Sequence, residues 1–125
     1  MGERLSYDVL VVGSGAAGLA AALSAERAGA RVALASKGPL QSCNSAKAQG
    51  GIQAGVGEDD SPEQHAADVW RSSHETADLR LVRVLTEEAP ATVHWLEEVG
   101  VEFTREDGGY RLARCGGATR RRLLQ

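Results

Sequence analysis

The sequence predicts an α/β fold built on a parallel β-sheet, and three features indicate it. A short β-branched apolar run, Tyr7 to Val12, ends at a glycine, an Ala- and Leu-rich stretch follows, and a second apolar run spans Arg31 to Ala35. Continuous apolar runs of this length are typical of strands buried on both faces of a parallel sheet. Strand, helix and strand therefore form one crossover unit at the start of the chain, which should be right-handed.

Length and composition indicate about one globular domain. The chain has 125 residues, 42% of them hydrophobic and 25% charged, and a net charge of −3. These values exclude a disordered or collagen-like chain. Glycines interrupt the most apolar run, Val9 to Leu23, and Met1 to Arg4 lack the features of a secretory signal. We therefore expect a cytoplasmic protein without membrane insertion, in which Cys43 and Cys115 are free thiols.

The first half of the chain contains one clear helix and one long loop. Residues from Ala16 to Ala28 are mainly good helix formers, and Gly29 supplies a left-handed cap. Residues 37–60 are rich in Gly, Ser, Gln and Asn and have poor periodicity. They predict a functional loop with one helical turn around Ala46 to Gly50.

Ser61 begins the next predicted helix. Pro62 occupies its first position, Gln64 completes a capping box, and the helix runs to about His74. Helical spacing places Asp68 on the face that mainly points to solvent.

Further helices and a hairpin complete the chain. Asp78 caps one helix, and Pro90 opens a separate helix that closes at Gly100. Two short strands, Val101 to Thr104 and Gly109 to Leu112, predict a small β-hairpin near the C-terminus.

A glycine motif stands between the first strand and the first helix. Gly13-Ser14-Gly15-Ala16-Ala17-Gly18 fits GxGxxG in the strand-to-helix context that a dinucleotide site requires. Gly13 allows the sharp turn, Gly15 lets the backbone approach a pyrophosphate, and Gly18 lets the helix pack close to the strand. The motif predicts a Rossmann-like domain, against the alternative of a glycine-rich turn that binds no ligand.

The residues at the end of the second strand do not decide which nucleotide binds. Domains of this class usually have an acidic residue there to hold a ribose, whereas this chain has Ser36-Lys37. A lysine at this place suggests a 2′-phosphate, and therefore NADP as an alternative to FAD or NAD.

Ser36-Lys37-Gly38-Pro39 and the segment Asn44-Ser45-Ala46-Lys47-Ala48-Gln49-Gly50-Gly51-Ile52 resemble the flavin-binding region of a known family. That family contains the flavoprotein subunits of succinate dehydrogenase and fumarate reductase, and L-aspartate oxidase. The resemblance continues in collinear order to Gly116-Gly117 and Arg121, so it covers nearly the whole chain.

The resemblance implies FAD, with the adenosine half on residues 13–18 and 36–37 and the isoalloxazine half on residues 44–51. The small-residue loop agrees with this, because its amide donors can approach a flavin ring closely. Members with covalent FAD carry histidine at the position of Asn44, so FAD is expected to be bound non-covalently. The candidate cofactor-binding residues are Gly13, Ser14, Gly15, Ala16, Ala17, Gly18, Ser36, Lys37, Asn44, Ser45, Ala48, Gln49, Gly50 and Gly51.

The resemblance also implies an oxidoreductase that moves a hydride between flavin and a small dicarboxylate of the succinate or fumarate type. Residues 1–125 would then be the N-terminal part of an FAD-binding domain, with the catalytic residues and the dicarboxylate site in the missing remainder. An iron–sulfur subunit as partner and a peripheral place at the inner face of the membrane are further implications. L-aspartate oxidase is the alternative, favoured by Asn44 and disfavoured by Ala118-Thr119, where that enzyme usually has His-Ser. A non-catalytic nucleotide-binding module and an NADP-dependent reductase fragment remain as other classes.

The remaining polar residues predict structural roles. His65, His74 and His94 lack the spacing of a metal site, and no metal is expected. Cys115, before the double glycine, is either on the substrate side of the flavin or a buried thiol.

The arginines at 111, 114 and 120–122 predict a solvated or dicarboxylate-facing surface, because no aromatics are interleaved as in nucleic-acid sites. Leu123, Leu124 and the apolar face of residues 78–99, including Val82, Leu85, Val93 and Leu96, are expected to be partly exposed.

Overall fold

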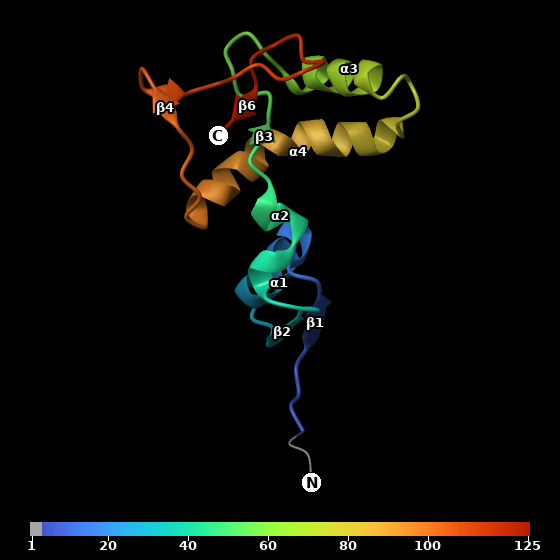
Figure 1. The fold of residues 1–125 in the computed structure, drawn as a ribbon, viewed down its shortest axis with the longest axis vertical. Helices are drawn as coiled ribbons and strands as arrows, with labels where there is room; N and C mark the ends of the chain where they lie inside the picture. Colours follow the sequence, from blue (N-terminus) through green and yellow to red (C-terminus); the bar gives the residue numbers. More distant parts are fainter. Residues whose placement is uncertain (1–3) are drawn as a thin grey trace. The chain divides into compact units, whose positions relative to one another are not determined.

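The chain begins with the predicted strand, helix and strand. In the computed structural model, which describes residues 4–125, β1 (Val9–Val12) is followed by α1 (Ala16–Arg27) and β2 (Val32–Ala35) (Figure 1). β1 and β2 pair in parallel, and their register starts with Val9 opposite Val32. The predicted order and the parallel pairing are confirmed. Residues 1–3, which belong to the predicted N-terminal features, lie outside the described residues.

The two faces of β1 differ. α1 packs against β1 and β2, and Val9 and Val11 are half-buried. Leu10 and Val12 alternate with them and are 65% and 80% exposed. The prediction of a strand buried on both faces is therefore wrong for this part of the chain. A helix on one face of a sheet buries only every second residue of a strand.

The predicted loop contains three short elements. These are a 3₁₀ turn, η1 (Leu40–Ser42), a one-turn helix, α2 (Asn44–Lys47), and a short strand, β3 (Ile52–Gln53). The helical turn begins earlier than predicted, and Ala48 already has extended backbone with ψ 135°. Sequence periodicity cannot locate a single turn, because one turn presents too few residues to show a pattern.

The chain divides into two compact units after Gln49. The second unit contains α3 (Pro62–Ser72) and α4 (Leu79–Glu98), which pack against each other. β6 (Leu123–Leu124) pairs antiparallel with β3. None of the helices in residues 4–125 has the length and apolar character needed to cross a bilayer.

The predicted break at Pro90 does not occur. α4 continues through Pro90 as one 20-residue helix that begins after Asp78, whose side chain accepts a hydrogen bond from the Arg80 amide. Figure 1 shows the helix bent near its middle, which is the expected effect of a proline that cannot donate to the preceding turn. Gly100 has φ 97° directly after the helix and ends it as predicted.

The hairpin lies slightly later than predicted. β4 (Arg105–Glu106) and β5 (Gly109–Tyr110) pair antiparallel, and the turn residues Asp107 and Gly108 have φ 52° and 83°. Residues 101–104, the predicted first strand, are not extended in a sheet. Two positive φ values match the backbone twist that two-residue hairpins require.

The core of the second unit consists of Ala54, Ala89, Val93 and Leu124. Val93 and Leu124 are both 0% exposed, and Val82 is 4% exposed. The prediction that these three residues are partly exposed is wrong: β6 returns to pair with β3 and buries Leu124 together with Val93, and α3 packs against α4 near Val82. Leu85 remains 58% exposed, as predicted.

Candidate cofactor-binding site

The glycine motif forms the turn between β1 and α1. The Gly13 amide donates to the carbonyl of Ala35 at 2.8 Å, so the β1–β2 ladder continues into the motif. Gly13 has φ 114°, a region that only glycine adopts freely. A β-carbon on Gly18 would lie 2.1 Å from the carbonyl oxygen of Gly13, so a side chain here requires the backbone to shift. At Gly15 a β-carbon would meet only Oγ of Ser45, at 3.4 Å, and the space beyond it is open.

The ends of the two strands and the start of α1 surround one cavity. Its volume is about 520 Å³, within the range of about 300–1,000 Å³ usual for ligand sites. Five predicted site residues line it, together with three that sequence reasoning missed. The predicted ones are Gly13, Ser14, Gly15, Ser36 and Lys37, and the others are Gly38, Ser42 and Cys43.

The missed residues come from the loop after β2. The Ser42 amide and Oγ both donate to the carbonyl of Pro39, at 2.9 and 2.7 Å, and the resulting η1 turn folds the loop back. Gly38, Ser42 and Cys43 thereby reach the glycine motif. The Pro39-to-Ser42 spacing of a short turn is the sequence signal that could have located them.

The start of α1 offers amide groups to this cavity. The first four amides of a helix have no intrahelical acceptor and carry the positive end of the helix dipole. Oγ of Ser45 accepts a hydrogen bond from the Ala16 amide at 3.1 Å, which ties α2 to α1. The following amides, of Ala17 and Gly18, are those that can receive phosphate oxygens.

Ser14 is a structural tie inside the motif. It is 6% exposed, its Oγ donates to the Leu40 carbonyl at 3.0 Å, and it lies 3.2 Å from Oγ of Ser36. These contacts hold the ends of β1 and β2 and the loop together. The hydroxyl of Ser14 is therefore engaged inside the protein.

The other predicted site residues are distributed between the two units. Asn44, Ala48 and Gln49 are exposed in the first unit. Gly50 and Gly51 are exposed at the start of the second, where Gly51 has φ 108°.

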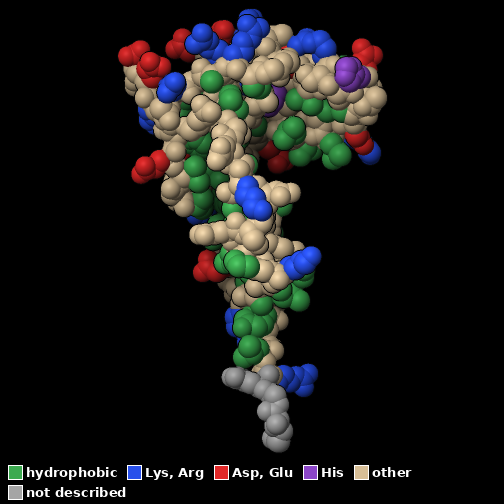
Figure 2. Space-filling view, viewed as in Figure 1, with side chains coloured by type: hydrophobic (Ala, Val, Ile, Leu, Met, Phe, Trp, Pro, Cys, Tyr) green, Lys and Arg blue, Asp and Glu red, His purple; other side chains and the backbone are tan. Residues whose placement is uncertain are grey.

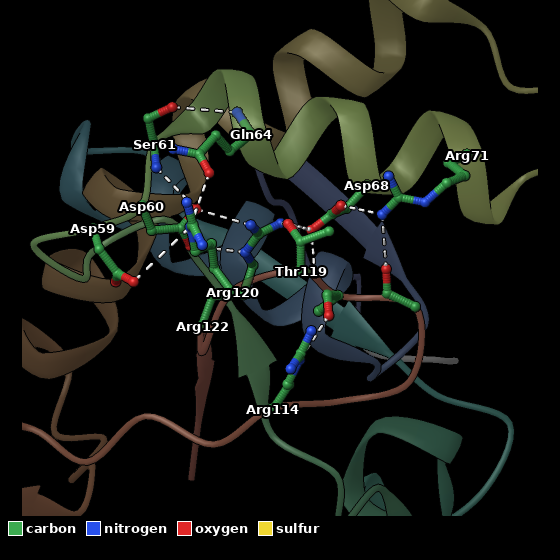
Figure 3. A network of polar contacts seen from close by, with 12 residues as sticks. Asp59, Asp60, Ser61, Gln64, Asp68, Arg71, Arg114, Thr119, Arg120 and Arg122 are labelled. Atoms are coloured by element: carbon green, nitrogen blue, oxygen red, sulfur yellow. Dashed lines mark hydrogen bonds and ion pairs between the residues drawn. The ribbon is translucent and has the colours of Figure 1, made fainter.

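A buried ion-pair network in the second unit corrects two predictions (Figure 3). Arg122 is 0% exposed, although the arginine-rich segment predicted a solvated or dicarboxylate-facing surface. Its Nε and Nη2 each donate to the Asp60 carboxylate at 2.8 Å. Asp68 is 5% exposed, although helical spacing placed it toward solvent, and Nη1 of Arg122 lies 3.1 Å from its Oδ2. The other arginines of the segment are exposed. Figure 2 shows basic and acidic side chains interspersed over the surface of the molecule.

Asp68 accepts several hydrogen bonds. The amide and Oγ1 of Thr119 donate to it at 2.7 and 2.9 Å, and Arg71 forms an ion pair with it. Burial favours a higher pKa for Asp68, but these donors and the charge of Arg122 together hold the pKa of Asp68 below its ordinary value. Asp68 is therefore ionised and connects α3 to the segment after the double glycine.

The three histidines differ in their surroundings. His65 is 3% exposed, and its Nδ1 has no hydrogen-bond partner in the described chain. Burial and the charge of Arg122 lower the pKa of His65, so it is neutral. His74 and His94 are exposed, and His94 lies 3.7 Å from Glu97. Within residues 4–125, no group of three or more His, Cys, Asp or Glu side chains is arranged to hold a metal ion.

Gly116 and Gly117, the double glycine, lie in a turn that packs against α3. The Ala118 amide donates to the carbonyl of Cys115 at 3.2 Å, and Gly117 has φ 80°. A β-carbon on Gly117 would lie 2.6 Å from Oγ of Ser72. Cys115 is a half-buried free thiol at the start of this turn.

The cavity in the first unit defines the class of the site. It lies at the carboxyl ends of two parallel strands and at the N-terminus of the helix between them, where dinucleotides bind in α/β sheets. The cavity is lined by glycines and Lys37 and lies at the amides of the α1 N-terminus, and this combination suits an anionic ligand. This combination fits the diphosphate of a dinucleotide.

Comparison with known proteins identifies the family. Residues 8–125 match the FAD binding domain family, and the chain belongs to it. The chain is 42% identical over 123 residues to L-aspartate oxidase of Streptomyces coelicolor, which covers 98% of this chain and 21% of that protein. It is 36% identical to the probable fumarate reductase Ifc3 of Shewanella frigidimarina, over 90% of this chain and 21% of that protein.

A solved structure agrees with this assignment. The fold superimposes on Mycobacterium smegmatis Sdh1, determined in complex with UQ1, with a TM-score of 0.89 and 37% identity. The match covers 97% of this chain and 21% of that one. Membership of the flavoprotein family and FAD as the cofactor, both predicted from the sequence, are confirmed. The chain spans about a fifth of the length of these relatives.

Proposed function

We propose that residues 1–125 provide the FAD-binding part of an oxidoreductase that moves a hydride between flavin and a small dicarboxylate of the succinate or fumarate type. The observation that supports this most is the cavity at the glycine motif, taken with the family match over residues 8–125. Because the chain spans about a fifth of its relatives, we assign substrate binding and proton delivery to sequence outside it.

Each half of the cofactor has its own residues in this proposal. The α1 amides and the open side of Gly15 receive the diphosphate, and Ser36 and Lys37 lie beside the adenosine half. Residues 44–51 hold the isoalloxazine half. When bound, FAD supplies the hydride donor and acceptor. Asn44 has no ring nitrogen that could bond to the flavin, so we propose non-covalent binding.

L-aspartate oxidase is the second candidate. The 42% identity to the Streptomyces coelicolor enzyme favours it, together with Asn44. Ala118-Thr119 after the double glycine disfavours it, because the resemblance leads us to expect His-Ser there in L-aspartate oxidase. An iron–sulfur subunit as partner, and a cytoplasmic place at the inner face of the membrane, belong to the first candidate as implications of the resemblance.

Titration of the chain with FAD tests the cofactor assignment. We expect saturable binding with quenching of flavin fluorescence, and no comparable binding of NADP. ADP should compete with FAD, because both place a diphosphate on the same amides. Tight NADP binding without FAD binding would instead support the reductase alternative. Succinate and aspartate oxidation, assayed with the full-length protein, separates the two candidate activities.

A further inference from the structure

The buried cation Arg122 connects two segments that are distant in sequence. Its guanidinium forms two parallel hydrogen bonds with Asp60, in the loop before α3, and both side chains are 0% exposed (Figure 3). Paired hydrogen bonds between a guanidinium and a carboxylate fix orientation as well as distance. The start of β6 is therefore held at one place against the loop before α3.

The backbone of Arg122 continues this connection into β3. Its carbonyl accepts a hydrogen bond from the Ala54 amide at 3.0 Å. The following residues pair antiparallel with β3, with Leu123 opposite Gln53 and Leu124 opposite Ile52. The side chain of Arg122 thus fixes the start of β6 against Asp60, and backbone hydrogen bonds fix β3 against β6.

Gly50 and Gly51 directly precede β3, and Gly51 packs closely against β6. A β-carbon on Gly51 would lie 2.2 Å from the carbonyl oxygen of Leu124. Nε2 of Gln125 donates to the carbonyl of Gly50 at 3.2 Å. The Gly51 backbone is therefore placed against β6, and the Gly50 backbone is held by Gln125, the residue after β6. Both glycines are part of the predicted flavin-binding loop.

We propose that Arg122 is a positioning residue for the flavin, which acts by holding β6 and thereby the Gly50–Gly51 backbone. This inference rests on the proposed function, in which that backbone contacts the isoalloxazine half. Arg122 itself is 0% exposed within the protein and needs no contact with the cofactor.

Two substitutions test this in the 125-residue chain. Arg122→Lys keeps the charge and loses the paired geometry, and Arg121→Lys is the same change at the exposed neighbouring position. Val82→Ala serves as a control for general destabilisation, because Val82 is buried between α3 and α4, away from β6. Gln125→Ala removes the hydrogen bond to Gly50 at an exposed residue, so it shows how far the C-terminal end of the chain fixes Gly50 independently of Arg122.

The readouts are the amide NMR signals of Gly50 and Gly51 without FAD, and the visible absorption and circular dichroism of the chain saturated with FAD. We expect Arg122→Lys to shift both glycine signals, to change the flavin spectrum at saturation and to weaken FAD binding about tenfold. Gln125→Ala should shift the same signals less. Arg121→Lys should change none of these, and Val82→Ala should lower only the melting temperature.

Unchanged glycine signals in a folded Arg122→Lys would overturn the positioning role of Arg122, as would a wild-type flavin spectrum of that variant at saturation. A wild-type chain that binds no FAD would refute the proposed function instead. The glycine signals in the free chain would still decide whether Arg122 positions residues 50 and 51.

Discussion

The carbonyl oxygen of Gly13 would be only 2.1 Å from a β-carbon at Gly18. A β-carbon at Gly15 would contact only Oγ of Ser45, at 3.4 Å. The glycines of one motif therefore serve different purposes. Gly18 allows α1 to pack close to β1, and Gly15 keeps space open toward the cavity. Substitution can separate the two roles.

Gly18→Ala is expected to destabilise the first unit. The added methyl group must displace the turn or the helix, and overpacking of this kind costs about 1–3 kcal/mol. Urea denaturation measures the loss. Gly38→Ala is the matched control, because its β-carbon would lie 3.5 Å from Ser42 Oγ, an ordinary contact, and its stability should stay near wild type.

Gly15→Val is expected to abolish FAD binding while the chain still folds. The branched side chain would fill the space of the pyrophosphate, and its cost to the helix start is only about 1 kcal/mol. Titration with FAD and far-UV circular dichroism measure the two effects. Gly109→Val, in β5 and with no atom closer than 4.0 Å to its β-carbon, is the control. Equal flavin affinity in the two variants would disprove the assignment of the motif.

Denaturation with acid is expected to release all flavin from the chain. Asn44 is exposed in α2 and offers no ring nitrogen for a covalent bond. Absorbance near the flavin bands should appear in the supernatant after precipitation. A yellow protein pellet would show a covalent attachment and contradict the proposal.

His65 is expected to make stability fall with decreasing pH. Its pKa in the folded state is lowered from 6.5, so the unfolded chain binds the proton more tightly. The free energy of unfolding should therefore decrease as pH falls below about 6.5, with a slope of at most about 1.4 kcal/mol per pH unit. Urea denaturation between pH 5 and pH 8 measures the slope.

Replacing His65 by Asn should flatten this dependence. His74→Asn is the matched control, since His74 is exposed and its φ of 53° is one that asparagine tolerates. Asp68 adds a second effect at lower pH. Its folded-state pKa is lowered, so the stability it contributes is present above its unfolded pKa and is lost as pH falls through the folded one. An unchanged slope in His65→Asn would assign the pH dependence to other groups.

FAD is expected to raise the melting temperature of the 125-residue chain, and NADP is not. A ligand specific for the folded state stabilises it by about 2.7 kcal/mol at a hundredfold excess over Kd. The exposed apolar residues Leu10 and Val12 indicate modest stability without ligand. Thermal melts with each nucleotide measure the shift, and assays of the same samples should show no succinate, fumarate or aspartate turnover. A melt that FAD leaves unchanged would contradict the proposed site.

The sequence by itself determined the strand–helix–strand unit, the turn at Gly13 and the close packing at Gly18. These features depend on neighbouring residues: turn geometry, helix propensity and close packing across a few positions are local properties. The starts of α3 and α4 were predictable for the same reason, because Ser61 and Asp78 accept hydrogen bonds from amides two or three residues ahead.

Only the tertiary structure decided the burial of Asp68, Arg122 and Leu124. Local patterns assigned these residues to the surface, since an acidic residue, an arginine run and a chain terminus are usually solvated. Their burial depends on β6 returning to pair with β3 about seventy residues earlier, and on Asp60 meeting Arg122 at a sequence separation of 62. A buried charge is stable only when a distant partner compensates it, and no local pattern contains that partner.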